Sequence, residues 1–140
     1  MTHIPQILIT YYLQTDYHVF GESPFALKVG IASQSLMELY KQTQTDCGVF
    51  ITAWNPHSRV VEASANQEKQ AELVKEISQR NLIFIDGVGR HPKGEWPEEA
   101  SFFVLGLSLE TGKVLGIKYH QNAVIWCGSN SIPELALLKK

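Results

Sequence analysis

Residues 48–85, GVFITAWNPHSRVVEASANQEKQAELVKEISQRNLIFI, decide the fold expected for this chain. They begin with a continuous apolar run, 48–54, that is too short for a helix and rich in strand-forming residues, which predicts a strand buried on both faces. A helix is expected from about residue 65 to residue 80, and 82–85 is the next buried strand. Such β-α-β units are parallel and right-handed, so both strands should end at the same edge of the sheet.

Two helices are predicted from capping-box spacing, in which Ser or Thr is followed three residues later by Glu or Gln. Ser64 and Gln67 stand in this relation at the start of the helix at 65–80. Ser35 and Glu38 do so earlier in the chain, where they predict a helix. Residues 108–120 are ambiguous between a helix and a hairpin arm. The helix is favoured by its apolar face, although the glycines at 112 and 116 weaken it.

The remaining strands follow from strand-forming composition between turn signals. The predicted strands are 7–20, 25–29, 101–107, 123–126 and 135–138, and the first two should form an N-terminal hairpin around the turn at 21–24. We therefore predict one α/β (α+β) domain over residues 1–140. It would be a mixed, mostly buried β-sheet of about six strands with about three helices, containing the right-handed β-α-β unit.

The amino-acid composition of the chain makes some classes of function less favoured than others. The chain has 140 residues, 44% hydrophobic and 19% charged, and a net charge of −2 without a Lys/Arg cluster beyond Lys139-Lys140, which makes a nucleic-acid partner the third-ranked hypothesis. The sequence lacks a membrane-spanning run and a leader pattern, so a bacterial-type cytoplasmic protein without a membrane partner is expected. Cys47 and Cys127 have neither metal nor redox spacing.

Three polar clusters are expected to meet at one edge of the sheet. Residues 54–56 follow the first strand of the β-α-β unit, and the run GEWPEE at 94–99 leads into the strand at 101–107. Gln121 and Asn122 begin the strand at 123–126. Because the strand at 101–107 most simply returns antiparallel, all three clusters fall on the side where open α/β sheets usually bind ligands. Both cysteines fall at the opposite edge, which disfavours a cysteine nucleophile.

The residues of these clusters suggest a polar pocket with tryptophan. Glutamates can act as general acid or base, and the candidate catalytic residues are Glu99, at the mouth of a strand, and Glu95. Amides would orient a ligand, an indole would stack on it, and an arginine would meet an anionic group. The structural alternatives are turn capping, an exposed acidic loop and local ion pairs. The candidate ligand-binding residues are Asn55, Arg59, Arg90, Glu95, Trp96, Glu99, Gln121 and Asn122.

Metal and cofactor chemistry has little support in the sequence. His57, His91 and His120 also fall at this edge, but they come from three separate segments without ligand spacing, so coincidence is the better explanation and no metal site is predicted. The sequence contains no P-loop, no His-Glu-x-x-His and no serine nucleophile elbow. A cofactor is therefore not identified.

The same clusters, together with residues elsewhere in the chain, carry a family resemblance. The residues concerned are Tyr17 with Pro24-Phe25, residues 51–56 with Ser58, 94–97, Ser101 with 104–107, Leu115-Gly116 with Tyr119, and 121–123 with Trp126. In these positions the chain resembles a family of small bacterial proteins known as a domain of unknown function, DUF3293. The resemblance runs nearly end to end and implies the helical form of residues 108–120. It implies no activity.

Two hypotheses of function follow. The leading one is a small-molecule-binding domain with its pocket at the edge described; if the site is catalytic, a glutamate acts as general acid or base and the amides orient the substrate. The alternative is a protein-protein interaction module in which Trp96 and its acidic loop anchor a partner surface. A concave pocket lined by Trp96 would favour the first, and a protruding Trp96 the second.

Overall fold

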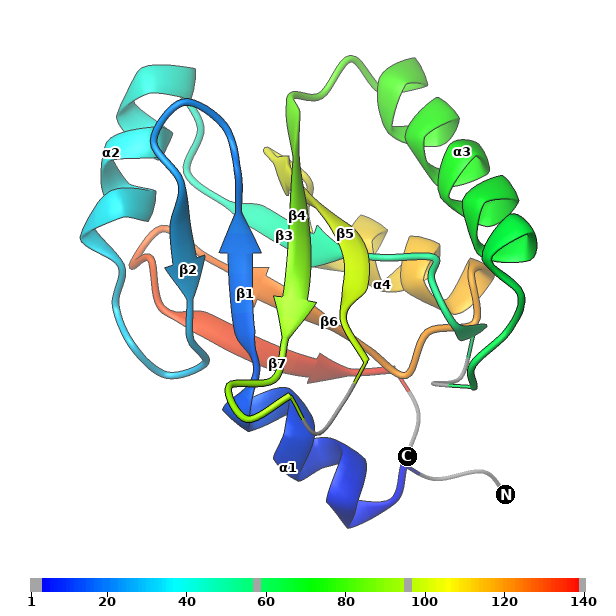
Figure 1. The fold of residues 1–140 in the computed structure, drawn as a ribbon. Coiled ribbons are helices and arrows are strands. Elements are labelled where there is room, and N and C mark those ends of the chain that lie inside the picture. The colour runs from blue at the N-terminus through cyan, green and yellow to red at the C-terminus, as the bar shows by residue number, and fades with distance from the viewer. Residues whose placement is uncertain (1–3, 57–58, 95–96, 139–140) are drawn as a thin grey trace.

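Four helices and a seven-stranded sheet make up the described part of the chain, residues 4–56, 59–94 and 97–138 of a computed structural model (Figure 1). The α+β fold class is confirmed, with one helix and one strand more than expected. In chain order the elements are α1 (Gln6–Gln14), β1 (Asp16–Val19), β2 (Phe25–Leu27), α2 (Gln34–Thr43), β3 (Gly48–Ile51), α3 (Ala63–Gln79), β4 (Phe84–Arg90), β5 (Glu99–Leu105), α4 (Leu109–Lys118), β6 (Ala123–Cys127) and β7 (Pro133–Leu137).

The strand order is β2-β1-β4-β5-β3-β6-β7, and each neighbouring pair is antiparallel. Strands β3 and β4 run in the same direction, as expected for the unit around α3, but β5 lies between them. Phe103 of β5 is opposite Phe50 of β3 on one side and Ile85 of β4 on the other. This order brings the ends of β3 and β4 next to the beginning of β5, and β6 begins beside the end of β3.

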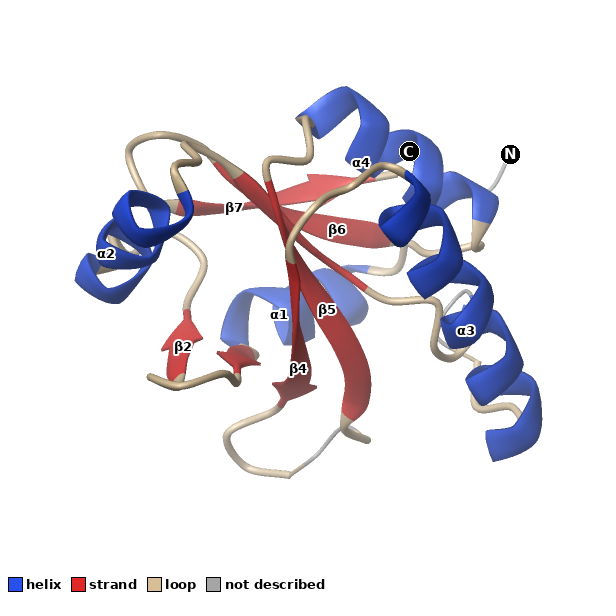
Figure 2. Cartoon of the chain, turned by 90° about the horizontal axis from the view of Figure 1, so that it is seen from above, coloured by secondary structure: helices blue, strands red, loops and turns tan. Residues whose placement is uncertain are grey.

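Helices cover both faces of the sheet, which explains why its central strands are almost continuously apolar. On one face Phe102 belongs to a core with Leu73 of α3 and residues of α4. On the other face Phe103 belongs to a core with Leu36 of α2. Figure 2 shows α2 on one side of the sheet and α3 and α4 on the other, with β4 and β5 crossing the direction of β6 and β7.

The single strand expected at residues 7–20 is wrong. Residues 6–14 form α1, and only Asp16–Val19 form a strand, which pairs with β2 in the expected hairpin. The amides of Leu8 and Ile9 donate to the Pro5 carbonyl at the start of the helix. The half-buried residues of α1 recur at helical spacing, so packing of one helical face outweighs the strand propensity of its Tyr, Ile and Thr residues.

Both predicted capping boxes are misplaced. Helix α2 is capped by Ser33, whose hydroxyl accepts from the Leu36 amide at 3.1 Å, two residues before the expected Ser35. Helix α3 begins at Ala63 after Glu62, which makes no side-chain cap. Ser64 therefore lies inside the helix. The spacing alone does not identify a cap because the residue must also adopt an extended backbone just before the first turn.

The helix predicted within residues 108–120 is confirmed as α4, Leu109–Lys118, with Ser108 as its cap. Close packing against the sheet explains why this helix contains two glycines. A Cβ at Gly112 would lie 3.0 Å from a methyl of Val49, and one at Gly116 would lie 3.0 Å from a methyl of Val124. The glycines thus let α4 lie directly on β3 and β6. Within the described residues, no helix is long and apolar enough to cross a bilayer.

Candidate functional site

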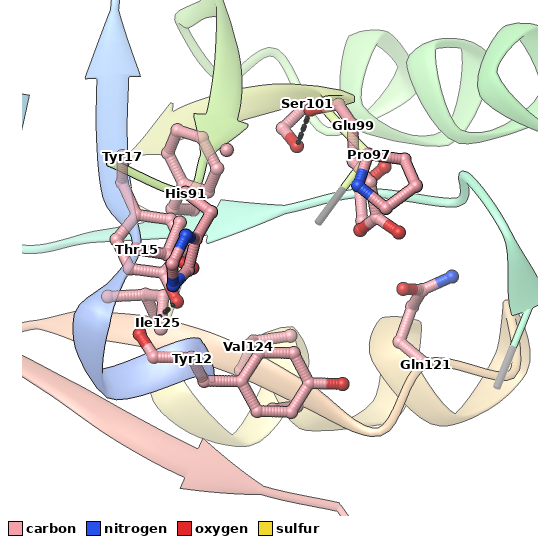
Figure 3. A pocket seen from close by; sticks show the side chains of 14 residues that line it. Tyr12, Thr15, Tyr17, His91, Pro97, Glu99, Ser101, Gln121, Val124 and Ile125 are labelled. Carbon is pink, nitrogen blue, oxygen red and sulfur yellow. Dashed lines mark hydrogen bonds between the residues drawn. The ribbon is translucent and has the colours of Figure 1, made fainter. Parts of the chain in front are cut away.

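A cavity of about 60 Å³ lies on the α2 side of the sheet, where β3 and β4 end and β5 and β6 begin (Figure 3). A space of about 10–15 Å³ already admits one water, so the cavity has room for several waters or for the head group of a ligand. Residues of α1, β1, β3, β4, β5 and β6 and of the adjoining loops line it. They are Tyr12, Thr15, Tyr17, Phe50, Thr52, Gly89, His91, Pro97, Glu99, Ser101, Gln121, Ala123, Val124 and Ile125.

Alternation along β4 and β5 creates this space. Residues two apart in a strand point to the same face, so Glu99 and Ser101 point to the face on which Phe103 is buried. Opposite them in β4 stand two glycines, Gly89 facing Glu99 and Gly87 facing Ser101. Because glycine has no side chain, nothing from β4 fills the volume beside the glutamate, and the apolar core of this face ends in an open, partly polar chamber.

Glu99 is the acid of this chamber. Burial raises its pKa from 4.5 to about 7, against a smaller lowering effect of the Asn55 hydrogen bond. That bond is long, 3.5 Å from Asn55 Nδ2 to Glu99 Oε2, and it is the one hydrogen bond found for this carboxylate among the described residues. A carboxyl group that titrates near neutrality can give or take a proton at physiological pH.

Asn55 is fixed by α3. Its backbone amide donates to Asn66 Oδ1 at 2.8 Å, and its own Oδ1 accepts from Asn66 Nδ2 at 2.9 Å and from the Val61 amide at 3.3 Å. The Val61 N–H can only donate, which settles the orientation of the Asn55 amide and directs its Nδ2 to Glu99. Asn55 has φ +47°, a left-handed conformation that Asn tolerates better than most residues.

Gln121 presents an oxygen to the cavity. Its Nε2 donates to the carbonyls of Trp54 and Tyr119, both at 3.2 Å. Carbonyls can only accept, so the amide orientation is determined and Oε1 is the free end. Figure 3 shows this oxygen on the cavity side. No described side-chain nitrogen or oxygen is both buried and unpartnered, so Oε1, which accepts from no described group, is reachable.

His91 is held by protein on both ring nitrogens. The Lys93 amide donates to Nδ1 at 3.3 Å, so Nε2 carries the proton and donates to Gln14 Oε1 at 3.1 Å. His120 is exposed, and His57 lies outside the described residues. Among the residues that the structure describes, no group of three or more His, Cys, Asp or Glu is arranged to hold a metal ion.

The arginines do not reach the cavity. Arg90 forms an ion pair with Glu98 at 3.1 Å, and both side chains are about half exposed. Arg59 is exposed beyond the end of β3 and does not line the cavity. An anion clamp by either residue at this site is therefore not formed in the structure. The pairing instead joins the end of β4 to the loop before β5.

The other predicted site residues divide into three groups. Glu99 and Gln121 line the cavity, and Asn55 contacts Glu99 from outside it. Asn122 is buried, but it is not a lining residue, and its carbonyl accepts from the Leu138 amide at 2.8 Å. Glu95 and Trp96 lie outside the described residues. Of the predicted site residues, Glu99, Gln121 and Asn55 thus lie together at the expected edge of the sheet.

Sequence reasoning missed two parts of the site. The first is the wall from α1 and β1, because residues 7–20 were assigned to one strand. The second is the buried polar end of α3, where Gln70 Oε1 accepts from the Ala53 amide at 2.7 Å and Gln70 Nε2 donates to the Ala100 carbonyl at 2.9 Å. Asn66 and Gln70 share one helical face with Leu73, so extending the apolar stripe toward the N-terminus would have found them.

Comparison with known proteins adds a family. The model of a family described as "Protein of unknown function (DUF3293)" matches residues 51–124, which is more than half of the chain. The matched segment contains the end of β3, α3, β4, β5 and α4, and with them Asn55, Asn66, Glu99 and Gln121. No curated protein and no solved structure matches the chain.

Proposed function

Since the chain belongs to the DUF3293 family of proteins of unknown function, its role has to be inferred from its site, and we propose that it binds a small molecule in the cavity at Glu99. In this proposal Glu99 is the group that exchanges a proton with the ligand. The observation that carries the proposal is a carboxyl group directed into an open chamber with a single long hydrogen bond among the described residues.

Such an arrangement costs stability. A half-buried carboxylate without a cation or close donors keeps little of the solvation it has in water, which is why its pKa rises. Purely structural acids are normally paired or well hydrated. An acid in a concave site that has neither a cationic partner nor full hydration is typical of groups that act on a ligand.

The rigidity of the surroundings also supports the proposal. Asn66 and Gln70 of α3 bind the backbone at Asn55, Ala53 and Ala100, which joins the end of β3 to the start of β5. Glu99 therefore stands on a strand whose first residues are fixed from the helix. A site built in this way is preorganised, because its polar groups do not have to rearrange when a ligand enters.

If the protein is an enzyme, Glu99 is its general acid or base and Gln121 orients the substrate through Oε1. The geometry does not select a reaction beyond proton transfer. The proposal places the protein in the cytoplasm, where Cys47 and Cys127 would remain the free thiols that they are in the structure.

The test is a fragment-binding screen followed through backbone amide signals by NMR. A mixed library of small amines, carboxylates, amides and alcohols at millimolar concentration should shift the signals of Gly89, Ser101 and Gln121. The same fragments should not bind Gly89→Leu, whose side chain would enter the cavity. Gly89→Ala is the matched control, because a Cβ at this position meets Thr15 at an ordinary 3.6 Å. If no fragment shifts these signals, the proposal is wrong.

A further inference from the structure

Most of the side-chain donors that line the cavity, the Tyr12 hydroxyl apart, donate to named groups of the protein itself. The hydroxyls of Thr15, Thr52, Tyr17 and Ser101 donate to backbone carbonyls, His91 donates to Gln14, and the Gln121 amide donates to two carbonyls. Each of these donors is engaged by an acceptor of the protein. A ligand in the cavity would therefore find few side-chain N–H or O–H groups able to donate to it.

Acceptors remain free. The Glu99 carboxylate has four acceptor sites and receives one long bond, and Gln121 Oε1 receives none from the described residues. In Figure 3 both groups reach the cavity on the same side of the view, Glu99 from the start of β5 and Gln121 below it from the loop before β6. Among the described residues, neither Lys nor Arg lines this space.

A cavity with free acceptors and spent donors selects its ligand by charge and by hydrogen-bond polarity. We infer that the ligand is a small protonated amine whose ammonium group donates to the Glu99 carboxylate and to Gln121 Oε1. Its aliphatic part would lie against the apolar wall formed by Phe50, Val124 and Ile125. The inference rests on the proposed function and names the ligand class for the same site.

Other ligand classes fit less well. A carboxylate or phosphate would bring acceptors to acceptors and a negative charge to Glu99, which costs desolvation without new hydrogen bonds. An alcohol can donate only once. An ammonium offers three donors from one atom, and its bond to an ionised carboxylate is among the stronger hydrogen bonds in proteins.

Binding of an ammonium would require Glu99 to be ionised. The titratable groups that face Glu99 are Tyr12 of α1, Tyr17 of β1 and His91 after β4. Burial raises the pKa of the Tyr17 hydroxyl far above neutrality, so it contributes no charge. Bound ammonium would be the nearest cation to Glu99 and would lower its pKa, so that amine binding near pH 7 should release a proton.

The experiment compares three ligands of similar size and different charge: n-propylamine, 1-propanol and propionate. Each is titrated at pH 8 and followed at Gly89, Ser101 and Gln121 by NMR. The amine should bind at least about tenfold more tightly than the other two, as expected for a charged hydrogen bond. Glu99→Gln should lose that preference. Glu98→Gln, which removes the neighbouring exposed acid, should keep it.

A second measurement needs no variant. The affinity of the wild-type protein for n-propylamine should fall as the pH is lowered from 8 to 5, and titration calorimetry in two buffers of different ionisation enthalpy should detect proton release near pH 7. Equal or tighter binding of propionate or 1-propanol, or an affinity for the amine that is independent of pH, would overturn the amine inference. In that case fragment binding at the same signals would leave the proposed function intact. Absence of binding by all three ligands and by the library would overturn both.

Discussion

Asn66 and Asn55 are joined by two hydrogen bonds, one from the Asn55 backbone amide to Asn66 Oδ1 and one from Asn66 Nδ2 to Asn55 Oδ1. Asn66 is 2% exposed and Asn55 5% exposed, so water does not replace either bond. Through this pair, helix α3 fixes the turn after β3, in which Asn55 has a left-handed conformation. The pair also directs the side-chain Nδ2 of Asn55 to Glu99.

Replacement of Asn66 by alanine should therefore destabilise the fold. The Asn55 amide and Oδ1 would lose buried partners, and an unsatisfied buried polar group costs about 1–3 kcal/mol. Urea denaturation should show a loss of that size in the free energy of unfolding. Gln67→Ala, at the exposed neighbouring position on the same helix, is the control and should change it by less than about 0.5 kcal/mol. Equal stability of the two variants would show that the asparagine pair contributes nothing.

Glu99 should make the folded protein less stable as the pH rises. An acid in an ion pair has the opposite effect, because its pKa is lowered by folding. Between pH 4.5, the usual pKa of glutamate, and about 7, its pKa in the folded protein, the folded state binds more protons than the unfolded state. The free energy of unfolding therefore falls as the pH rises through this window, by at most roughly 3 kcal/mol. Glu99→Gln should remove this fall and be more stable than the wild type at pH 8.

The measurement for Glu99 is denaturant unfolding of both proteins at several values between pH 4 and pH 8. The difference between them isolates the glutamate, because other titrating groups are common to both. Glu98→Gln should follow the wild-type curve, since Glu98 is half exposed and makes only a surface ion pair. A difference that does not change with pH would mean that the Glu99 pKa is normal.

Sequence patterns predicted the class of fold, and the cavity lies at the edge where they placed the polar clusters, because both depend on buried strands and on chain direction. Residues 48–54 and 82–85 are apolar enough to identify central strands, and antiparallel return is the simplest path for the strand that follows the loop after β4. The insertion of β5 between β3 and β4 could not be predicted, because pairing between strands depends on side-chain fit across the sheet and has no local signal.

The cavity could not be predicted from local sequence patterns either, because it also depends on strand pairing. Gly87 and Gly89 look like loop residues until β4 is known to extend to Arg90, and only the register of Gly89 against Glu99 shows that it leaves space beside the glutamate. Burial of Glu99 depends on that space and on α1, whose composition indicated a strand. The buried position of Asn66 was different, since its spacing from Leu73 and Ile77 on α3 was visible in the sequence.

The thiols should be unreactive in the folded protein. Burial raises the pKa of Cys127 to about 12, and it also raises the pKa of the half-buried Cys47. With a pKa near 12, only on the order of one Cys127 in ten thousand is a thiolate at pH 8, and the thiolate is the reactive form. In Cys47→Ser, alkylation of Cys127 by iodoacetamide should follow unfolding across a urea series. Labelling in native buffer as fast as in high urea would contradict this.

Two glycines of one strand should respond in opposite ways to alanine. A Cβ at Gly87 would lie 2.3 Å from the His18 carbonyl oxygen and 2.9 Å from the Phe50 ring, so backbone must move. Such overpacking costs about 1–3 kcal/mol. A Cβ at Gly89 meets only ordinary contacts, and alanine there restricts the unfolded chain, which should stabilise the protein by up to about 1 kcal/mol. Thermal unfolding of Gly87→Ala and Gly89→Ala measures both. Equal melting temperatures would mean that β1 does not approach β4 closely at Gly87.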